Sequence, residues 1–166
     1  MKRFLALSIL LLMSACSTTR HDTVSHTTTP SDESRMNSLA IYAMSLSDTP
    51  YRYGGADPEN GFDCSGFVQF VFQNSVGMSL PRTSAEMSRV GIPMDISELR
   101  PGDLVFFNTR HSRFSHVGIF IGENRFVHSP KTGKAISIAS LDDRYWRSHF
   151  DGARRIPINQ KIVKNQ

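Results

Sequence analysis

Residues 61–66 read Gly-Phe-Asp-Cys-Ser-Gly, and the apolar side chains that follow are Phe67, Val68, Val71 and Phe72. Apolar residues at this spacing line one face of an α-helix, so the stretch predicts an amphipathic helix that begins at the cysteine. The first turn of a helix offers unpaired backbone N–H groups and the positive end of the helix dipole. Both favour a thiolate over a thiol, so the sequence places this sulfur where it can become a nucleophile.

The beginning of the chain has the features of an export signal. Two basic residues at positions 2 and 3 precede a mainly apolar run at residues 4–13, and Ser14-Ala15 then leads into Cys16. The run is too short to cross a bilayer as a helix and is typical of a signal peptide. The segment resembles the lipobox of bacterial lipoproteins, in which the cysteine is acylated and becomes the new N-terminus. An ordinary signal peptide with an unmodified cysteine is the alternative.

We therefore divide the chain into four segments. They are a lipoprotein signal peptide at 1–15, the lipidated cysteine with a Ser/Thr-rich tether at 16–33, one domain at 34–160 and a polar tail at 161–166. Of the 19 Lys and Arg residues, two lie in the signal peptide, which leaves 17 against 15 acidic residues. This net charge is too small to indicate nucleic-acid binding, and no basic stripe with interleaved aromatic residues is present. We therefore expect no nucleic-acid partner.

The domain changes from helical to strand periodicity along its length. A helical face at residues 36–44 comes first, a loop at 51–62 follows, and the cysteine-bearing helix comes next. Five strands are expected after these helices, at residues 104–107, 116–121, 125–128, 135–138 and 153–156. A short helix capped by Ser140 is expected between the last two strands. Helices followed by strands favour an α+β fold in which helices pack on an antiparallel sheet of about five strands.

Two histidines lie on neighbouring strands of this sheet. His116 opens one strand and His128 closes the next, and residues 122–124 between them have turn composition. A three-residue loop that sets Ile121 opposite Arg125 would place both rings on the same face as diagonal neighbours. A two-residue loop would send them to opposite faces, unless a bulge restores the parity.

Given that register, the three residues predict a nucleophilic site. Cys64 is the nucleophile, His116 pairs with the thiolate and protonates the leaving group, and His128 orients the ring of His116. The backbone N–H of Cys64 would help to bind the oxyanion. A buried inert thiol and a zinc site are the alternatives, although no short paired ligand spacing supports zinc, and no cofactor is expected. The remaining histidines are interpreted as structural: His21, His26, His111 and His149.

Further segments accompany these residues in a fixed order. They are Tyr-Arg-Tyr-Gly-Gly at 51–55, Leu-Pro-Arg at 80–82, Pro-Gly-Asp-Leu-Val-Phe-Phe at 101–107, His-Val-Gly-Ile at 116–119 and Phe-Val-His at 126–128. Together with Asp-Cys-Ser-Gly at 63–66, they resemble the NlpC family of papain-like cell-wall cysteine peptidases. The resemblance runs from about Pro50 to Ile156 and is closest to the small Gram-negative lipoproteins of that family.

The resemblance implies a reduced papain-like fold and a peptidoglycan substrate. The scissile bond would be an amide of a stem peptide or cross-link that contains a D-amino acid or diaminopimelate. Tyr51 matches the tyrosine that assists the oxyanion, and it could instead be a loop aromatic that covers the core. Asp63 and Ser65 would meet the polar end of the stem peptide and Arg82 a substrate carboxylate; a helix cap for Asp63 and a solvated loop charge for Arg82 remain open.

These expectations describe a hydrolase of the cell envelope. The predicted protein is a thiol protease that faces the periplasm, with a lipid anchor on Cys16, and Ser17 implies the outer membrane by the same resemblance. Two alternatives keep the same scaffold. One is a lipoprotein that binds peptidoglycan without cutting it, and the other is an acyl or amide transferase that uses the same three residues.

Overall fold

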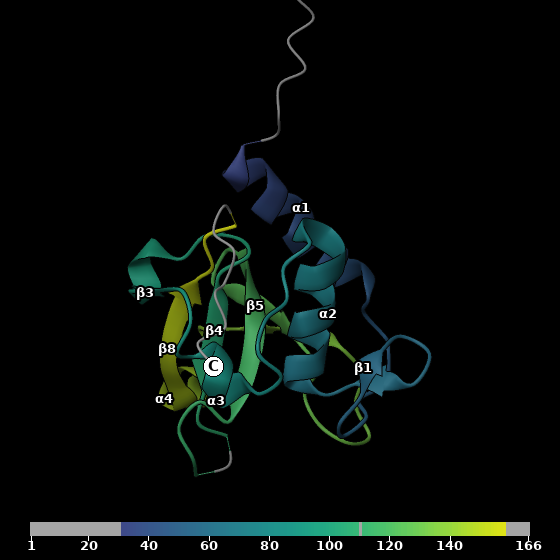
Figure 1. The fold of residues 1–166 in the computed structure, drawn as a ribbon. Coiled ribbons are helices and arrows are strands. Elements are labelled where there is room, and N and C mark those ends of the chain that lie inside the picture. Colours follow the sequence, from purple (N-terminus) through teal and green to yellow (C-terminus); the bar gives the residue numbers. More distant parts are fainter. Residues whose placement is uncertain (1–30, 110, 159–166) are drawn as a thin grey trace, which may run out of the picture.

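The computed structural model describes residues 31–109 and 111–158 (Figure 1). The predicted signal peptide, Cys16 and the polar tail lie outside these residues. The helices are α1 (Asp32–Ser45), α2 (Cys64–Val76), α3 (Ser84–Met87) and α4 (Arg144–His149), with a 3₁₀ turn at Ile96–Glu98. The strands are β1 (Ala56–Asp57), β2 (Gly61–Phe62), β3 (Ile92–Met94), β4 (Leu104–Phe107), β5 (His116–Gly122), β6 (Arg125–His128), β7 (Ser137–Ser140) and β8 (Phe150–Arg155).

Local signals explain where the two long helices begin and end. Ser31 caps α1 by accepting a hydrogen bond from the Ser34 amide, and Asp63 caps α2 in the same way from the Gly66 amide. Such caps satisfy backbone N–H groups that have no partner inside the helix. Gly77 ends α2 in the left-handed conformation, at φ 72°, which glycine adopts without steric cost. Helix α2 therefore begins at Cys64, as the sequence predicts.

The main sheet is antiparallel and has six strands in the order β3-β8-β4-β5-β6-β7. Helices α1 and α2 pack together and against β5 (Figure 1). The α+β prediction is confirmed, but the expected number of strands is one too low. The additional strand is β3, which includes Pro93 and pairs only with β8. A proline within a short run weakens the strand pattern in the sequence, but it is tolerated on an edge strand, where its missing N–H can face away from the ladder.

The hairpin that carries the two histidines has a bulge. Gly122 lies opposite Arg125, but Phe120 lies opposite Phe126, so the ladder is irregular at Ile121. The expected pairing of Ile121 with Arg125 is wrong, since the turn has two residues. The extra residue at the bulge restores the parity, and both histidine rings lie on one face. The bulged alternative therefore describes the hairpin.

The last elements are displaced from their expected positions. β7 pairs with β6 at residues 137–140, because Ala135 forms an isolated bridge with Pro50 instead. β8 begins at Phe150, three residues earlier than expected, directly after α4. Asp143 caps α4, with its carboxylate accepting from the amides of Tyr145 and Trp146, so the expected cap at Ser140 is wrong.

The sheet separates two clusters of buried side chains. The larger cluster joins α1 and α2 to one face of the sheet and includes Phe67, Val117 and Ile119. The smaller cluster lies on the other face and includes Phe107 and Phe126, with Trp146 of α4 packed against it. Alternate residues of β5 thus point into different clusters, as expected for a strand that is covered on both faces. No helix within the described ranges is long and apolar enough to span a membrane.

Candidate active site

Cys64 lies at the first position of α2 and is held there by its neighbours. The Asp63 carboxylate accepts hydrogen bonds from the amides of Gly66, at 2.7 Å, and of Gly54, at 3.1 Å. Gly66 allows a close approach, because a Cβ at this position would come within 2.1 Å of the Gly55 carbonyl oxygen. The loop at 51–55 is thereby fixed against the start of the helix. Cys64 is buried, with 6% of its surface exposed.

Two serines connect the histidine strands to segments that flank the cysteine helix in the sequence. The Ser129 hydroxyl, next to His128, donates to the carbonyl of Phe62, two residues before Cys64, at 2.7 Å. The Ser84 hydroxyl donates to the carbonyl of Phe114, two residues before His116, at 2.7 Å. Two residues before Ser84, Arg82 contacts both neighbours of Cys64. The start of α2, the start of β5 and the end of β6 therefore converge in the folded chain.

The two histidines form a buried pair. Nε2 of His116 lies 2.7 Å from Nδ1 of His128, and each residue has only 3% of its surface exposed. Burial lowers the pKa of His128 to about 4, so this ring is neutral at pH 7. A neutral imidazole has one acceptor nitrogen, and Nδ1 of His128 can serve as that acceptor for a proton on Nε2 of His116. This arrangement leaves Nδ1 of His116 to act on the cysteine.

Arg82 is linked to both residues that flank Cys64. Its Nη1 donates to Oδ1 of Asp63 at 3.0 Å and to the Ser65 hydroxyl at 2.9 Å, and its Nη2 donates to Oδ2 of Asp63 at 2.7 Å. Burial acts to raise the pKa of Asp63, but the hydrogen bonds from Arg82 and Gly66 hold it below its usual value. The pKa of Arg82 is raised by its hydrogen bond to Asp63 and by the negative charge of that carboxylate.

The structure thus joins Asp63, Ser65 and Arg82 in one network beside the thiol. Asp63 has the capping role that the sequence left open, and it forms the ion pair at the same time. Arg82 keeps 39% of its side chain exposed, so it also reaches the surface. Tyr51 is partly buried and its backbone bridges to Phe62, which brings this residue to the same region.

Sequence reasoning missed three residues of this region. Ser84 links α3 to the residues before β5, Ser129 links the end of β6 to Phe62 just before α2, and Trp146 packs against both histidine rings. The position of Ser129 directly after His128 was the available signal, whereas nothing in the local sequence links Trp146 to residues 116 and 128. Within residues 31–109 and 111–158, no group of three or more His, Cys, Asp and Glu side chains could hold a metal ion.

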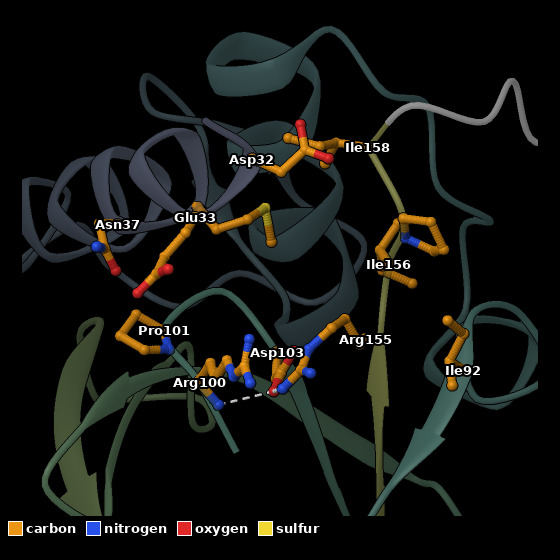
Figure 2. A pocket seen from close by; sticks show the side chains of 12 residues that line it. Asp32, Glu33, Asn37, Ile92, Arg100, Pro101, Asp103, Arg155, Ile156 and Ile158 are labelled. Carbon is orange, nitrogen blue, oxygen red and sulfur yellow. Dashed lines mark hydrogen bonds and ion pairs between the residues drawn. The ribbon is translucent and has the colours of Figure 1, made fainter. Parts of the chain in front are cut away.

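A separate cavity of about 270 Å³ lies at the other end of the sheet (Figure 2). It is bounded by the first turn of α1, the exposed Ile92 of β3, and the ion pair between the buried Asp103 and the partly exposed Arg155. Asp103 directly precedes β4, whereas His116 pairs with the last residue of β4, Phe107. The cavity and the histidine pair are therefore at opposite ends of the same strand.

A comparison with protein families matches residues 48–155 to the model described as the NlpC/P60 family. This range covers more than half of the chain and includes Cys64, His116 and His128. The chain belongs to the NlpC/P60 family. The resemblance to this family, inferred from its motifs, is thereby confirmed.

Individual members of the NlpC/P60 family show the extent of the likeness. The chain is 46% identical over 110 residues to "Murein DD-endopeptidase MepH" of Escherichia coli (strain K12), covering 64% of this chain and 41% of that protein. It is 37% identical over 164 residues to "Probable endopeptidase NlpC" of the same strain, covering 94% of this chain and all of that protein. The chain spans less than half the length of several curated relatives that it matches.

Solved structures of the NlpC/P60 family share the fold. An NlpC/P60 family protein from Bacillus cereus superposes with a TM-score of 0.68 at 31% identity, covering 74% of this chain and 40% of that chain. The NlpC/p60 domain of the peptidoglycan hydrolase SagA superposes with a TM-score of 0.62 at 28% identity, covering 72% of this chain and 98% of that domain. The reduced papain-like architecture is thus common to all three.

Proposed function

We propose that this chain is a cysteine endopeptidase of peptidoglycan that uses Cys64, His116 and His128. The observation that carries the proposal is the convergence of these residues. A capped helix begins at Cys64, Nε2 of the buried His116 lies 2.7 Å from Nδ1 of the buried His128, and hydrogen bonds of Ser84 and Ser129 link the neighbouring segments. The relative named as a murein DD-endopeptidase supports the substrate class.

The first half of the reaction forms an acyl-enzyme. Nδ1 of His116 takes the proton of Cys64, and the thiolate attacks the carbonyl carbon of the scissile amide. The resulting oxyanion is stabilised by the backbone N–H of Cys64 and by the hydroxyl of Tyr51, because such donors act on charge that develops in the transition state. When the C–N bond breaks, the imidazolium of His116 gives its Nδ1 proton to the leaving amine, and a thioester remains on Cys64.

The second half returns the enzyme to its starting state. Nδ1 of His116 accepts a proton from a water molecule, whose oxygen attacks the thioester carbon. Collapse of the tetrahedral intermediate releases the carboxylic acid and restores the thiolate–imidazolium pair. His128 stays neutral throughout and holds Nε2 of His116, so that the ring does not rotate between the two steps.

The residues beside Cys64 suit a stem peptide. We propose that the scissile amide contains a D-amino acid or diaminopimelate, and that the network of Asp63, Ser65 and Arg82 contacts the polar end of the peptide. Arg82 is the member with the largest exposed fraction, and its guanidinium suits a carboxylate of the substrate. A murein DD-endopeptidase among the relatives supports a bond between D-residues.

We further propose that the protein is an envelope lipoprotein that faces the periplasm. The basic start, the apolar run and Ser-Ala-Cys at 14–16 support a lipid anchor on Cys16, and Ser17 supports the outer membrane. Two or more acyl chains give stable anchoring, where one gives only marginal binding. Because α1 begins at Asp32, with Ser31 as its cap, the Ser/Thr-rich residues that precede position 31 would then act as a tether between the anchor and the peptidase domain.

The proposal is tested by digestion of purified muropeptides, with products separated and weighed by mass spectrometry. The wild type should release peptides of defined mass, and Cys64→Ala should release none, because no other thiol remains in the domain. Equal turnover by both proteins would end the proposal. Binding to sacculi without products, together with a Cys64 that does not react with a thiol probe, would support the non-catalytic lipoprotein.

The same digestion separates hydrolysis from transfer. A transferase resolves the thioester with an amine instead of water, so its products gain the mass of the amine. Digestion in the presence of free D-amino acids should leave the product masses of a hydrolase unchanged. Products that carry an added amino acid would favour the transferase.

A further inference from the structure

Trp146 packs against both histidine rings and is the only tryptophan of the chain. Its ring stacks on that of His116, with centroids 5.7 Å apart and an interplanar angle of 27°. It meets the ring of His128 almost at a right angle, with centroids 4.8 Å apart. One indole therefore covers the two rings whose mutual hydrogen bond orients the base.

The surrounding structure holds Trp146 in this place. Asp143 caps α4 and accepts a hydrogen bond from the Trp146 amide, at 3.4 Å. At the other end of α4, the carbonyl of His149 accepts from the amide of Asn108, which follows β4. Phe107 and Phe126 pack against the indole edge to face, with centroids 4.8 and 5.1 Å away. The indole is thus fixed by both its helix and the sheet.

The histidine pair needs support for a positive charge. In triads whose third member is a carboxylate, that group stabilises the imidazolium by its negative charge. Neutral His128 supplies a hydrogen bond without a charge, and His116 has only 3% of its surface exposed, so water can do little to solvate a charge on its ring. The face of an indole attracts a cation within about 6 Å of the ring centroid, and more strongly where water is excluded. The stacked ring of Trp146 meets that condition.

We propose that Trp146 is a positioning residue that holds the His116 ring against its indole face and stabilises the thiolate–imidazolium pair of Cys64 and His116. This inference deepens the proposed function, on which it rests. The face of the indole would thus supply part of the stabilisation of the imidazolium that a carboxylate supplies in other catalytic triads. A residue that only fills space would act through its volume, whereas this role depends on its π electrons.

A pair of substitutions separates these two roles. Trp146→Phe keeps an aromatic face, and Trp146→Leu keeps an apolar side chain without one. We expect Trp146→Leu to slow alkylation of Cys64 by iodoacetamide at pH 7 by about 5- to 30-fold, equivalent to roughly 1–2 kcal/mol. Trp146→Phe should stay within about threefold of the wild type. In muropeptide digestion, the Leu variant should lose kcat with little change in KM, because the substrate does not need the indole to bind.

Tryptophan fluorescence tests the same contact without altering Trp146. A protonated imidazole in contact with an indole quenches its emission, and the chain has one tryptophan, so the signal has one source. Cys64→Ala and His116→Gln each remove the imidazolium, and both should raise the emission at pH 7. Equal emission from the wild type and these variants would overturn the inference, as would equal alkylation rates of the wild type and Trp146→Leu.

The two proposals fail in different ways. If Cys64 reactivity depends on Trp146 but the wild type releases no muropeptide products, the inferred positioning stands and the peptidase function is wrong. If digestion requires Cys64 but Trp146→Leu reacts as fast as the wild type, the peptidase function stands and the positioning role is wrong.

Discussion

The region around Cys64 and the cavity near the start of β4 each contain an aspartate–arginine pair, and the pairs differ in their surroundings. Near Cys64, Arg82 and Asp63 share two hydrogen bonds, with side chains 39% and 14% exposed. At the cavity end, Arg155 and Asp103 share two hydrogen bonds, with side chains 27% and 2% exposed. The carboxylate of the cavity pair is thus almost fully buried, whereas that of the pair near Cys64 keeps some exposed surface, and both arginines are partly exposed.

The difference in burial between the two carboxylates indicates that the two ion pairs have different roles. Asp103 also accepts a hydrogen bond from the Arg100 amide, so its pair joins the turn before β4 to the end of β8 (Figure 2). Arg82 instead reaches the Ser65 hydroxyl, next to the thiol. A buried ion pair that loses one charge leaves the other uncompensated, whereas an exposed pair contributes little to stability. We therefore expect the cavity pair to maintain the fold and the pair near Cys64 to serve the reaction.

Asp103→Asn should have the largest effect on stability. The substitution removes the negative charge beside Arg155, whose side chain is 27% exposed and keeps some access to water, so we expect the free energy of unfolding to fall by about 2–4 kcal/mol. Urea unfolding followed by circular dichroism measures this change. Turnover of muropeptides per folded molecule should stay within about twofold of the wild type, because the pair lies at the far end of β4.

Asp142→Asn is the matched control for that substitution. Its partner Arg147 and Asp142 itself are both more than 60% exposed, so the change in unfolding free energy should stay below about 1 kcal/mol. A similar loss for both variants would show that burial does not separate the two kinds of pair. A large loss of activity in folded Asp103→Asn would contradict the assignment of the cavity end to stability alone.

The cysteine helix was predictable because its signals are local. Asp63 as cap, Cys64 at the first position and apolar residues at helical spacing all lie within one short stretch, and the structure has the helix there. The capping role and the ion pair of Asp63 use the same carboxylate, and only the structure shows that Arg82 is its partner. A contact across 19 residues of sequence leaves no periodic pattern to read.

For the histidine hairpin, the sequence predicted that both rings lie on one face but did not predict which register achieves this. Placing both rings on one face required an odd register or a bulge, and the chain uses a bulge at Ile121. Strand β3 and the contacts of Trp146 were not predictable, because Pro93 weakens the strand pattern and the indole meets the histidines only through tertiary packing. Local physics thus gives the elements, and long-range packing gives the contacts that surround the site.

Acid should lower the free energy of unfolding through the buried His128. The folded protein lowers the pKa of His128 from 6.5 to about 4, so between these pH values the unfolded chain binds a proton that the folded chain does not. The free energy of unfolding should therefore fall as the pH drops from 6.5 to 4, by about 3 kcal/mol at roughly 1.36 kcal/mol per pH unit. Above pH 6.5 this group should contribute no pH dependence.

His128→Gln isolates that contribution. Glutamine keeps an acceptor for Nε2 of His116 but does not titrate, so the stability of this variant should change less between pH 6.5 and 4 than that of the wild type. Urea unfolding of both proteins at several pH values gives the difference directly. Parallel curves for the two proteins would mean that His128 is not the group whose protonation weakens the fold.

Arg82→Gln should have the smallest effect on stability, and it tests whether the ion pair of Arg82 and Asp63 serves the reaction. Because Arg82 is 39% exposed, we expect the free energy of unfolding to fall by less than about 1 kcal/mol. We expect kcat/KM on muropeptides to fall about tenfold, since the fork that connects Asp63 to Ser65 is lost. Arg82→Lys distinguishes two origins of this loss. Lysine keeps the charge but cannot form the fork, so recovery by lysine indicates attraction of a substrate carboxylate, whereas failure to recover indicates that Arg82 acts by ordering the residues on either side of Cys64.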